Sequence, residues 1–299
     1  MSAITRKIGF VGLGRMGGAM ALRLLGAGYP VAGTARTREH AEPLLANGLQ
    51  WRETPRAVAE AADVVITSIP DDDALEAIAS GQDGILAGLA PQAIWIEMST
   101  VSPRASRALA PRVRERGARI LDAPVSGSVP QVQAGTLTIM VGGDEDAYAR
   151  VEAILRGLGT PTHVGANGQG LVLKLAINIS LAVQMLAFAE GLVLAQRSGI
   201  DRELALQVMV DSAIGSPMLK ARAANIYELP DEAWFDLDFL HKDIDLALAT
   251  GGELNVPLPT AARAEEILTV AHALGYGGRD LAAFFAVLEQ MTDDRADAA

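Results

Sequence analysis

Short apolar runs alternate with amphipathic segments through the first half of the chain. Runs of this length, separated by helical patterns, predict the strands of a parallel, doubly wound sheet with helices between them. The runs occupy residues 7–12, 30–34, 63–69, 93–98, 118–125 and 137–143. Two helix starts are also indicated, because Ser102 precedes Pro103 as a cap would, and three aspartates at 71–73 follow Pro70.

Beyond residue 165 the pattern changes to helical spacing. Apolar residues recur at helical intervals through residues 168–197, 202–212, 217–226, 236–250, 260–274 and 278–291. Gly165, Gly168 and Gly170 lie where the first domain would lead into the first and longest of these segments, and hinges and clefts between domains are often found at such places. We therefore predict an α/β protein with a doubly wound sheet in residues 1–164. An all-α domain, opened by one long helix, is predicted for residues 165–299.

The longest apolar stretch, residues 171–195, is interrupted by Lys174, Asn178, Gln184 and Glu190. These polar residues favour a buried helix over a membrane span. Lys174 raises a question of its own, because burying an unpaired ammonium group is costly. A lysine in such a run either extends its amine to solvent or is required where it stands.

The segment GFVGLGRMGGAM places Gly12, Gly14 and Gly17 in the G-x-G-x-x-G spacing, and Leu13, Arg15 and Met16 complete the loop. The loop follows a predicted strand directly and opens a predicted helix, and this context makes the motif informative. Gly12 permits the tight turn, Gly14 lets the backbone approach a pyrophosphate, and Gly17 lets helix and strand pack closely. The positive end of the helix then faces the phosphates of a dinucleotide.

The next strand predicts which dinucleotide is bound. An acid about 20 residues beyond the glycines usually holds a free ribose 2′-hydroxyl, but no Asp or Glu occurs between Gly17 and Arg38. Arg36, Thr37 and Arg38 stand there instead and suit a 2′-phosphate. We therefore predict that NADP(H) is preferred and that NAD(H) is a second option. The alternative is a pair of solvated arginines at a helix start.

Composition excludes several classes of function. The chain has 36 acidic against 25 basic residues, which argues against binding to nucleic acid or to an anionic membrane. It has no cysteine, so disulfides, thiolate nucleophiles and cysteine-ligated metals are excluded. The histidines, at positions 40, 163, 241 and 272, lack metal-ligand spacing, and no metal site is predicted. The first residues lack the order of a signal peptide, and a cytoplasmic protein is expected.

Five blocks in sequence order resemble the β-hydroxyacid dehydrogenase family, which includes 3-hydroxyisobutyrate dehydrogenase, tartronate semialdehyde reductase and the glyoxylate/succinic semialdehyde reductases. The blocks are GFVGLGRMGGAMALRLL, STVSP, DAPVSGS with GTLTIMVGG, GANGQGLVLKLAIN, and HKDIDLAL. The resemblance extends over nearly the whole chain. It implies a Rossmann-like domain followed by a helical domain, a nicotinamide cofactor, a small carboxylate-bearing substrate, and association into homodimers or homotetramers.

The resemblance also implies residue roles. Lys174 matches the catalytic lysine, and Asn178 matches a substrate-binding residue one helical turn away. Ser126 and Gly127 match the positions that contact the substrate carboxylate. The positions that match the lining of the nicotinamide cofactor are Ile69, Pro70, Thr100 and Lys242.

The chemistry of Lys174 agrees with this role. Residues four apart on a helix share a face, so Lys174 and Asn178 can reach one ligand. Reduction of a carbonyl by hydride leaves an alkoxide, which a lysine ammonium can protonate, and the neutral amine can take the proton back in oxidation. Desolvation in an inter-domain cleft is expected to lower the pKa of this amine into the useful range.

The chain departs from the family pattern at the substrate loop. Ser128 stands where relatives usually have a second glycine, and Pro130 follows it. Ile177 stands where relatives often have an asparagine before Asn178. These changes leave the identity of the substrate open.

Three functions remain as alternatives. The first is an NADP-dependent oxidoreductase that interconverts a small 3-hydroxy acid and its semialdehyde, or reduces a small aldehyde acid, with Lys174 as general acid and base. The second is an imine reductase on the same fold, which usually replaces this lysine with Asp or Tyr. The third is a non-enzymatic NADP-binding scaffold protein, and such relatives lose the lysine.

Overall fold

The computed structural model describes residues 6–297. The chain divides into two compact units, residues 1–174 and 175–299. The long helix α9 (Gln169–Arg197) begins within the first unit, where Leu171 is part of the core that covers one face of the sheet. The domain division at residues 164–165 stays a prediction.

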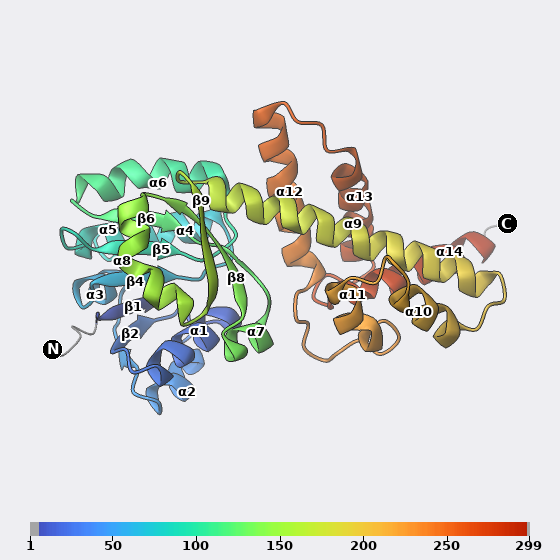
Figure 1. The fold of residues 1–299 in the computed structure, drawn as a ribbon, viewed down its shortest axis with the longest axis horizontal. Coiled ribbons are helices and arrows are strands. Elements are labelled where there is room, and N and C mark those ends of the chain that lie inside the picture. The colour runs from blue at the N-terminus through green and yellow to red at the C-terminus, as the bar shows by residue number, and fades with distance from the viewer. Residues whose placement is uncertain (1–5, 298–299) are drawn as a thin grey trace. The chain divides into compact units, whose positions relative to one another are not determined.

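Parallel strands form the centre of the first unit (Figure 1). Their order is β3-β2-β1-β4-β5-β6, as in a doubly wound sheet that reverses direction beside β1. β8 lies antiparallel to β6 and also pairs with β7 and β9. The strands are β1 (Ile8–Val11), β2 (Val31–Thr34), β3 (Gln50–Trp51), β4 (Val64–Thr67), β5 (Ile94–Glu97), β6 (Arg119–Asp122), β7 (Val125–Ser126), β8 (Leu137–Gly143) and β9 (Gly159–Gly165). The predicted α/β fold is confirmed.

The apolar pattern does not predict β3 or β9, and it joins the first residue of β7 to β6 in the single run 118–125. β3 and β7 span two residues each, too short to show a period. β9 has the sequence GTPTHVG, which is polar and contains Pro161. Proline is tolerated at sheet edges, and β9 pairs with β8 outside the main order of strands.

The parallel strands end in one row across the sheet. Val11 lies opposite Thr34 on one side and Thr67 on the other. Thr67 in turn lies opposite Glu97, and Glu97 lies opposite Asp122. The chain leaves its strand after each of these residues, so the loops that follow start from the same edge of the sheet.

Helices cover both faces of this sheet, and alternate strand residues point to opposite faces. Ile8 and Phe10 of β1 belong to the core beneath α1, α2 and α8, whereas Val11 belongs to the core beneath α3 to α6. The helices of the first face are α1 (Arg15–Gly26), α2 (Glu42–Leu45) and α8 (Glu145–Arg156), and those of the second are α3 (Pro55–Glu60), α4 (Asp72–Ala79), α5 (Ile85–Gly88) and α6 (Pro103–Glu115).

Both predicted helix starts are present. The Ser102 hydroxyl accepts the Ala105 N–H at 3.0 Å, with Pro103 as the first helical residue of α6. The Asp71 carboxylate accepts the Ala74 N–H at 2.8 Å at the start of α4. Helix capping therefore accounts for this part of the aspartate run.

The second unit is built from helices around its own core. Phe188 and Leu192 of α9 pack there with Leu240, Ile244 and Phe284. By length and composition alone α9 could cross a membrane, a test that the core helix of a soluble protein also passes. The other helices are α10 (Arg202–Asp211), α11 (Pro217–Arg222), α12 (Leu237–Leu254), α13 (Pro259–Ala273) and α14 (Phe284–Asp297).

A buried ion pair joins separate segments of this helical unit. The Asp280 carboxylate accepts a hydrogen bond from Arg222 Nε at 3.1 Å, and both side chains are almost fully buried. Asp280 also accepts the backbone N–H groups of Trp234 and Ala282, and the Arg222 guanidinium lies 5.5 Å from the centre of the Trp234 ring. Removing the carboxylate charge would leave the guanidinium buried without its counter-ion.

We expect Asp280→Asn to lower the free energy of unfolding by about 3–5 kcal/mol, because it breaks a buried ion pair from one side. The matched control is Asp293→Asn, which breaks the exposed pair with Arg197 and should change the free energy by less than about 1 kcal/mol. Urea denaturation followed by circular dichroism measures both values. Equal midpoints for the two variants would contradict a structural role for Asp280.

Candidate active site

The glycine turn joins β1 to α1 at the carboxyl edge of the sheet. Gly12 has φ +93°, and a Cβ added there would lie 2.1 Å from the carbonyl oxygen of Ser68. A Cβ added at Gly17 would lie 2.0 Å from the carbonyl oxygen of Gly12. Neither position tolerates a side chain, so the turn and the helix that follows are held directly against the sheet.

Gly14 differs from both, because a Cβ added there would meet no other atom of the described residues within 4 Å. It forms the N-cap of α1 without a side-chain cap, and the first turn contains no acid. The first N–H groups of a helix lack intrahelical partners and carry partial positive charge. Leu13 is buried, Met16 is half-buried and Arg15 is exposed. This open, uncapped helix start fits the pyrophosphate of a dinucleotide.

The segment after β2 is exposed and basic. Arg36, Thr37 and Arg38 all face solvent. The Arg38 guanidinium lies 5.3 Å from the centre of the Trp51 ring and 3.8 Å from the Glu53 carboxylate. Both charged groups of that pair are well exposed, so the pairing is weak and leaves the guanidinium able to bind a phosphate.

The loops after β4 and β5 are joined by a hydrogen bond. The Ile69 N–H donates to Ser99 Oγ at 2.7 Å. The first loop carries Ile69, which is half-buried, and Pro70, which is exposed, and the second carries the half-buried Thr100. The fold therefore brings these predicted cofactor positions together at the edge where the strands end.

The predicted substrate loop follows β7. Ser126, half-buried, pairs with Thr138 of β8, and Gly127 is exposed. The Ser128 N–H and hydroxyl both donate to Gln131 Oε1, at 2.9 Å each, at the start of α7 (Val129–Ala134). Ser128 is thus used as a helix cap, which gives a local structural reason for its departure from the family pattern.

Asp122 fixes the start of α9. Its two carboxylate oxygens accept the N–H groups of Gly168 at 2.7 Å and Leu171 at 3.1 Å. Burial raises the pKa of Asp122, although these hydrogen bonds act in the opposite direction. Lys174 follows Leu171 by about one helical turn and is only 9% exposed. Asp122 stands in the block DAPVSGS, but its sequence pattern alone indicates no role for it.

In the helical unit, Asn178 and Lys242 meet at Asp243. Asn178 Nδ2 donates to Asp243 Oδ2 at 2.6 Å, and Lys242 Nζ lies 2.8 Å from Asp243 Oδ1. Asn178 is 1% exposed, and its Oδ1 has no hydrogen-bond partner among the described residues. Asp243 was missed from sequence, although it stands next to Lys242 in the block HKDIDLAL.

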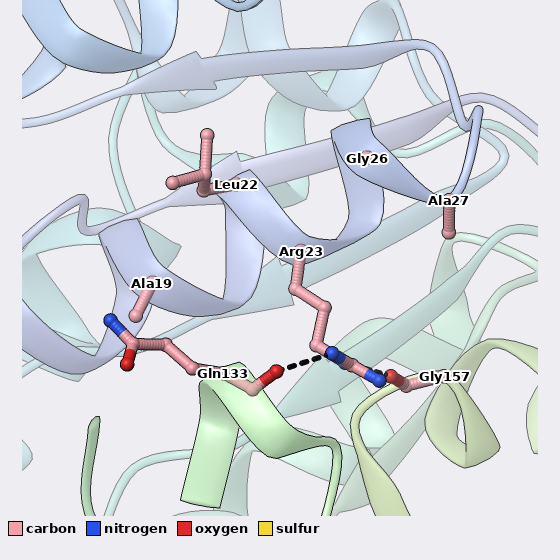
Figure 2. Close-up of a pocket in the computed structure, with 7 residues that line it drawn as sticks. All are labelled: Ala19, Leu22, Arg23, Gly26, Ala27, Gln133 and Gly157. Atoms are coloured by element: carbon pink, nitrogen blue, oxygen red, sulfur yellow. Dashed lines mark hydrogen bonds between the residues drawn. The ribbon is translucent and has the colours of Figure 1, made fainter. Parts of the chain in front are cut away.

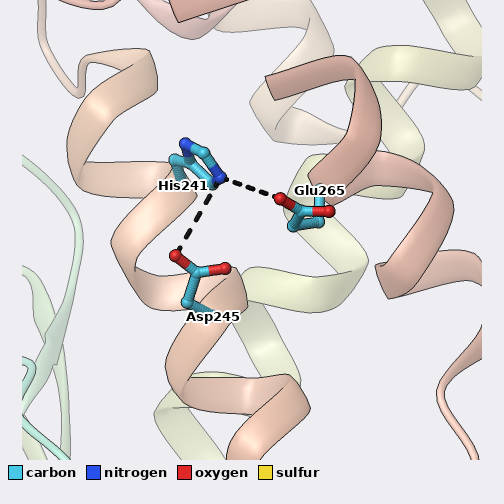
Figure 3. A group of neighbouring side chains, drawn as sticks. All are labelled: His241, Asp245 and Glu265. Atoms are coloured by element: carbon cyan, nitrogen blue, oxygen red, sulfur yellow. Dashed lines mark hydrogen bonds and ion pairs between the residues drawn. The ribbon is translucent and has the colours of Figure 1, made fainter. Parts of the chain in front are cut away.

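A second group of titratable side chains joins α12 to α13 (Figure 3). His241 Nε2 lies 3.2 Å from Glu265 Oε1 and 3.9 Å from Asp245 Oδ2. Thr269 donates to Glu265, and this bond together with His241 lowers the pKa of that carboxyl. Spacing along the sequence does not reveal the group, because Glu265 comes from a different helix.

A pocket of about 500 Å³ lies at the end of α1, away from the glycine turn in sequence. Figure 2 shows Arg23 reaching across it to α7 and to the turn before β9. The guanidinium donates to the carbonyl oxygens of Gly157 at 2.5 Å and Gln133 at 2.6 Å. Its bonds to main-chain oxygens indicate a structural role for Arg23.

Comparison with known protein families gives two matches that together extend over most of the chain. Residues 7–168 match the NAD binding domain of 6-phosphogluconate dehydrogenase. Residues 168–288 match a domain described as NAD-binding of NADP-dependent 3-hydroxyisobutyrate dehydrogenase. The two matches meet at the start of α9.

Individual relatives agree with these matches. The chain is 36% identical to 2-(hydroxymethyl)glutarate dehydrogenase of Eubacterium barkeri, over 96% of each chain. It is 33% identical to 2-hydroxy-3-oxopropionate reductase of Escherichia coli K12, over 97% of this chain and 99% of the other. Among solved structures, 3-hydroxyisobutyrate dehydrogenase of Mycobacterium tuberculosis with L-serine matches with a TM-score of 0.84 and 29% identity, over 95% of this chain and 99% of that one.

The glycine turn yields a test of cofactor binding without loss of fold. Gly14→Ala adds a methyl group where no described atom conflicts with it but where the pyrophosphate is predicted to approach, so we expect the affinity for NADPH or NADH to fall about tenfold or more. The control is Gly26→Ala in the same helix, which also has open space. Fluorescence titration gives the affinities and thermal unfolding checks the fold. If both variants bind the cofactor as the wild type does, the glycine turn does not hold the pyrophosphate.

Proposed function

The chain belongs to the β-hydroxyacid dehydrogenase family, and from this premise we propose that it interconverts a small 3-hydroxy acid and its semialdehyde with NADP(H), using Lys174 as general acid and base. Its class, an NAD(P)-dependent 3-hydroxyacid dehydrogenase, follows from its relatives. The observation that supports the role of Lys174 most directly is its burial in α9, one helical turn before a buried asparagine whose amide oxygen lacks a partner among the described residues.

Lys174 has the chemistry that proton transfer requires. When bound, the nicotinamide supplies or accepts the hydride. In reduction the Lys174 ammonium donates a proton to the oxygen that becomes the alcohol, and in oxidation the neutral amine takes this proton. The start of α9 is held by Asp122, so the lysine is carried by a fixed helix and not by a loop.

Asn178 would orient the substrate. Its Nδ2 is bound by Asp243, which fixes the amide with its oxygen as acceptor. A buried acceptor without a partner costs about 1–3 kcal/mol. A substrate hydroxyl that donates to Oδ1 would recover this energy, and such a contact suits a hydroxy acid better than an apolar ligand.

The names of the relatives indicate a common substrate shape. In each named compound one carbon atom separates an alcohol or aldehyde carbon from a carboxylate carbon. The compounds are 2-(hydroxymethyl)glutarate, 3-hydroxyisobutyrate and 2-hydroxy-3-oxopropionate. L-Serine, present with the mycobacterial relative, has the same arrangement. We propose this shape for the substrate here, with Ser126 and Gly127 receiving the carboxylate. Homodimers or homotetramers and a cytoplasmic location stay predictions.

Lys174→Ala provides the first test of the reaction. We expect kcat to fall by about two to four orders of magnitude, because a general acid and base contributes that much, while NADPH binding persists. Turnover is measured with glyoxylate, succinic semialdehyde, tartronate semialdehyde, methylmalonate semialdehyde and a cyclic imine. The control is Lys7→Ala, an exposed lysine before β1, which should leave turnover unchanged.

The same panel separates the alternatives. Turnover of an aldehyde acid that depends on Lys174 supports the proposed function. Imine turnover that survives Lys174→Ala would favour an imine reductase. Tight NADPH binding with no turnover of any compound would favour a scaffold protein.

The cofactor preference is tested at the arginines after β2. Arg36→Ala and Arg38→Ala should each raise KM for NADPH about tenfold, because hydrogen bonds to a charged group contribute about 1.5–3 kcal/mol, and should leave KM for NADH nearly unchanged. Arg104→Ala, at an exposed position of α6, is the matched control for loss of one positive charge. If KM for both cofactors changes equally, the arginines do not recognise the 2′-phosphate.

A further inference from the structure

Glu97 is a buried acid at the carboxyl end of β5, between β4 and β6. It is fully inaccessible to solvent, and both of its carboxylate oxygens have partners. Oε1 accepts the Ser99 N–H at 2.8 Å, and Oε2 accepts the Thr67 hydroxyl at 2.5 Å. Burying a carboxyl group in the centre of a sheet costs free energy, so packing alone does not explain why Glu97 stands there.

The hydrogen bonds continue from Glu97 to the two loops of the candidate cofactor site. Thr67 Oγ1 accepts the indole N–H of Trp95 at 2.9 Å. Ser99 Oγ accepts the Ile69 N–H at 2.7 Å. Through Ser99 the carboxyl group therefore holds the loop after β5, and through Ser99 and Thr67 together it holds the loop after β4.

We propose that Glu97 is the positioning residue of the nicotinamide site, because its carboxyl group fixes the loop that carries Ile69 and Pro70 against the loop that carries Thr100. The inference rests on the proposed function in so far as these loops contact the cofactor. Glu97 itself lies beneath them in the sheet and acts through Ser99 and Thr67. Nothing in the family resemblance assigns it a role.

The protonation of Glu97 makes this arrangement sensitive to pH. Burial raises the pKa of Glu97 to about 7, against the hydrogen bonds from Ser99 and Thr67, which lower it. The nearby negative charge of Asp122, on the neighbouring strand β6, raises the pKa of Glu97 further. Because the pKa is raised in the folded state, the neutral carboxyl group contributes its full stabilisation of the fold at pH values below the ordinary pKa of 4.5. This stabilisation is lost as pH rises through about 7.

Ionisation should loosen the loops. The neutral carboxyl group can accept from Ser99 and donate to Thr67, whose own hydroxyl hydrogen can turn to the Ile96 carbonyl oxygen 3.5 Å away. The charged form places an ion in a dry part of the sheet, and entry of water between the loops would solvate it. Cofactor affinity should therefore fall as pH rises from 6 to 8.

The variants separate charge from shape. Glu97→Gln keeps one acceptor for Ser99 and one donor for Thr67, so it imitates the neutral carboxyl group. Glu97→Ala removes both, and Ser99→Ala removes the acceptor of the Ile69 N–H. The matched control is Val151→Ala, which weakens the core beneath α8 without changing a residue of either loop.

The experiment measures binding of NADPH, and of NADH, by fluorescence between pH 5.5 and 8.5, together with KM and kcat. We expect Glu97→Ala and Ser99→Ala each to raise the cofactor Kd about tenfold. The double variant should be little worse than either single one, because both act on the same contact. Wild type should lose affinity about three- to tenfold from pH 6 to 8, and Glu97→Gln should show a flat profile.

Two results would overturn the proposal. One is a Kd for Glu97→Ala and Ser99→Ala no higher than that for Val151→Ala, and the other is the same pH profile in Glu97→Gln as in wild type. Binding is measured without substrate, so the result is independent of the reaction. A wild-type protein that binds the cofactor but turns over none of the panel compounds would refute the proposed function. The binding measurements would still test the positioning role of Glu97.

Discussion

The bond between the Asp122 carboxylate and the start of α9 is the interaction on which the rest of the candidate site depends. β6 ends at Asp122, and the two oxygens of its carboxylate accept the N–H group of Gly168, just before the helix, and that of Leu171, in its first turn. These N–H groups lack partners within the helix and lie at its positive end. The helix that carries Lys174 is therefore fastened to the edge of the sheet from which the loops after β4 and β5 also start.

This fastening needs a very close approach of helix and sheet. A Cβ added at Gly170 would lie 2.4 Å from the Met140 carbonyl oxygen and 2.8 Å from Asp122 Oδ2. Close packing therefore explains why a glycine stands at position 170, independently of any role of the segment as a hinge. Closely packed protein interiors have low compressibility and transmit small displacements. A displacement of the sheet edge is therefore expected to shift the start of α9, one turn from Lys174.

Sequence alone predicts the features of this protein that are local. The glycine turn lies in one stretch of strand, turn and helix, and its pattern predicts both its conformation and its position in the fold. Lys174 and Asn178 stand on one helix, so their spacing is informative. Glu97 and Asp243 could not be recognised in this way, because Glu97 acts on Thr67, 30 positions away, and Asp243 on Asn178, 65 positions away. Their roles appear only with strand register and helix packing.

Register also places two buried acids side by side, since Glu97 of β5 lies opposite Asp122 of β6. Burial is the largest cause of the raised pKa of both, and Asp122 adds to it at Glu97. Like charges this close in a dry interior do not ionise independently. Asp122 is the better placed to carry the charge, because backbone N–H groups and Asn167 stabilise it. Below about pH 7 the proton then resides on Glu97, so the residue proposed to position the loops after β4 and β5 and the residue that holds the start of α9 form one coupled electrostatic unit.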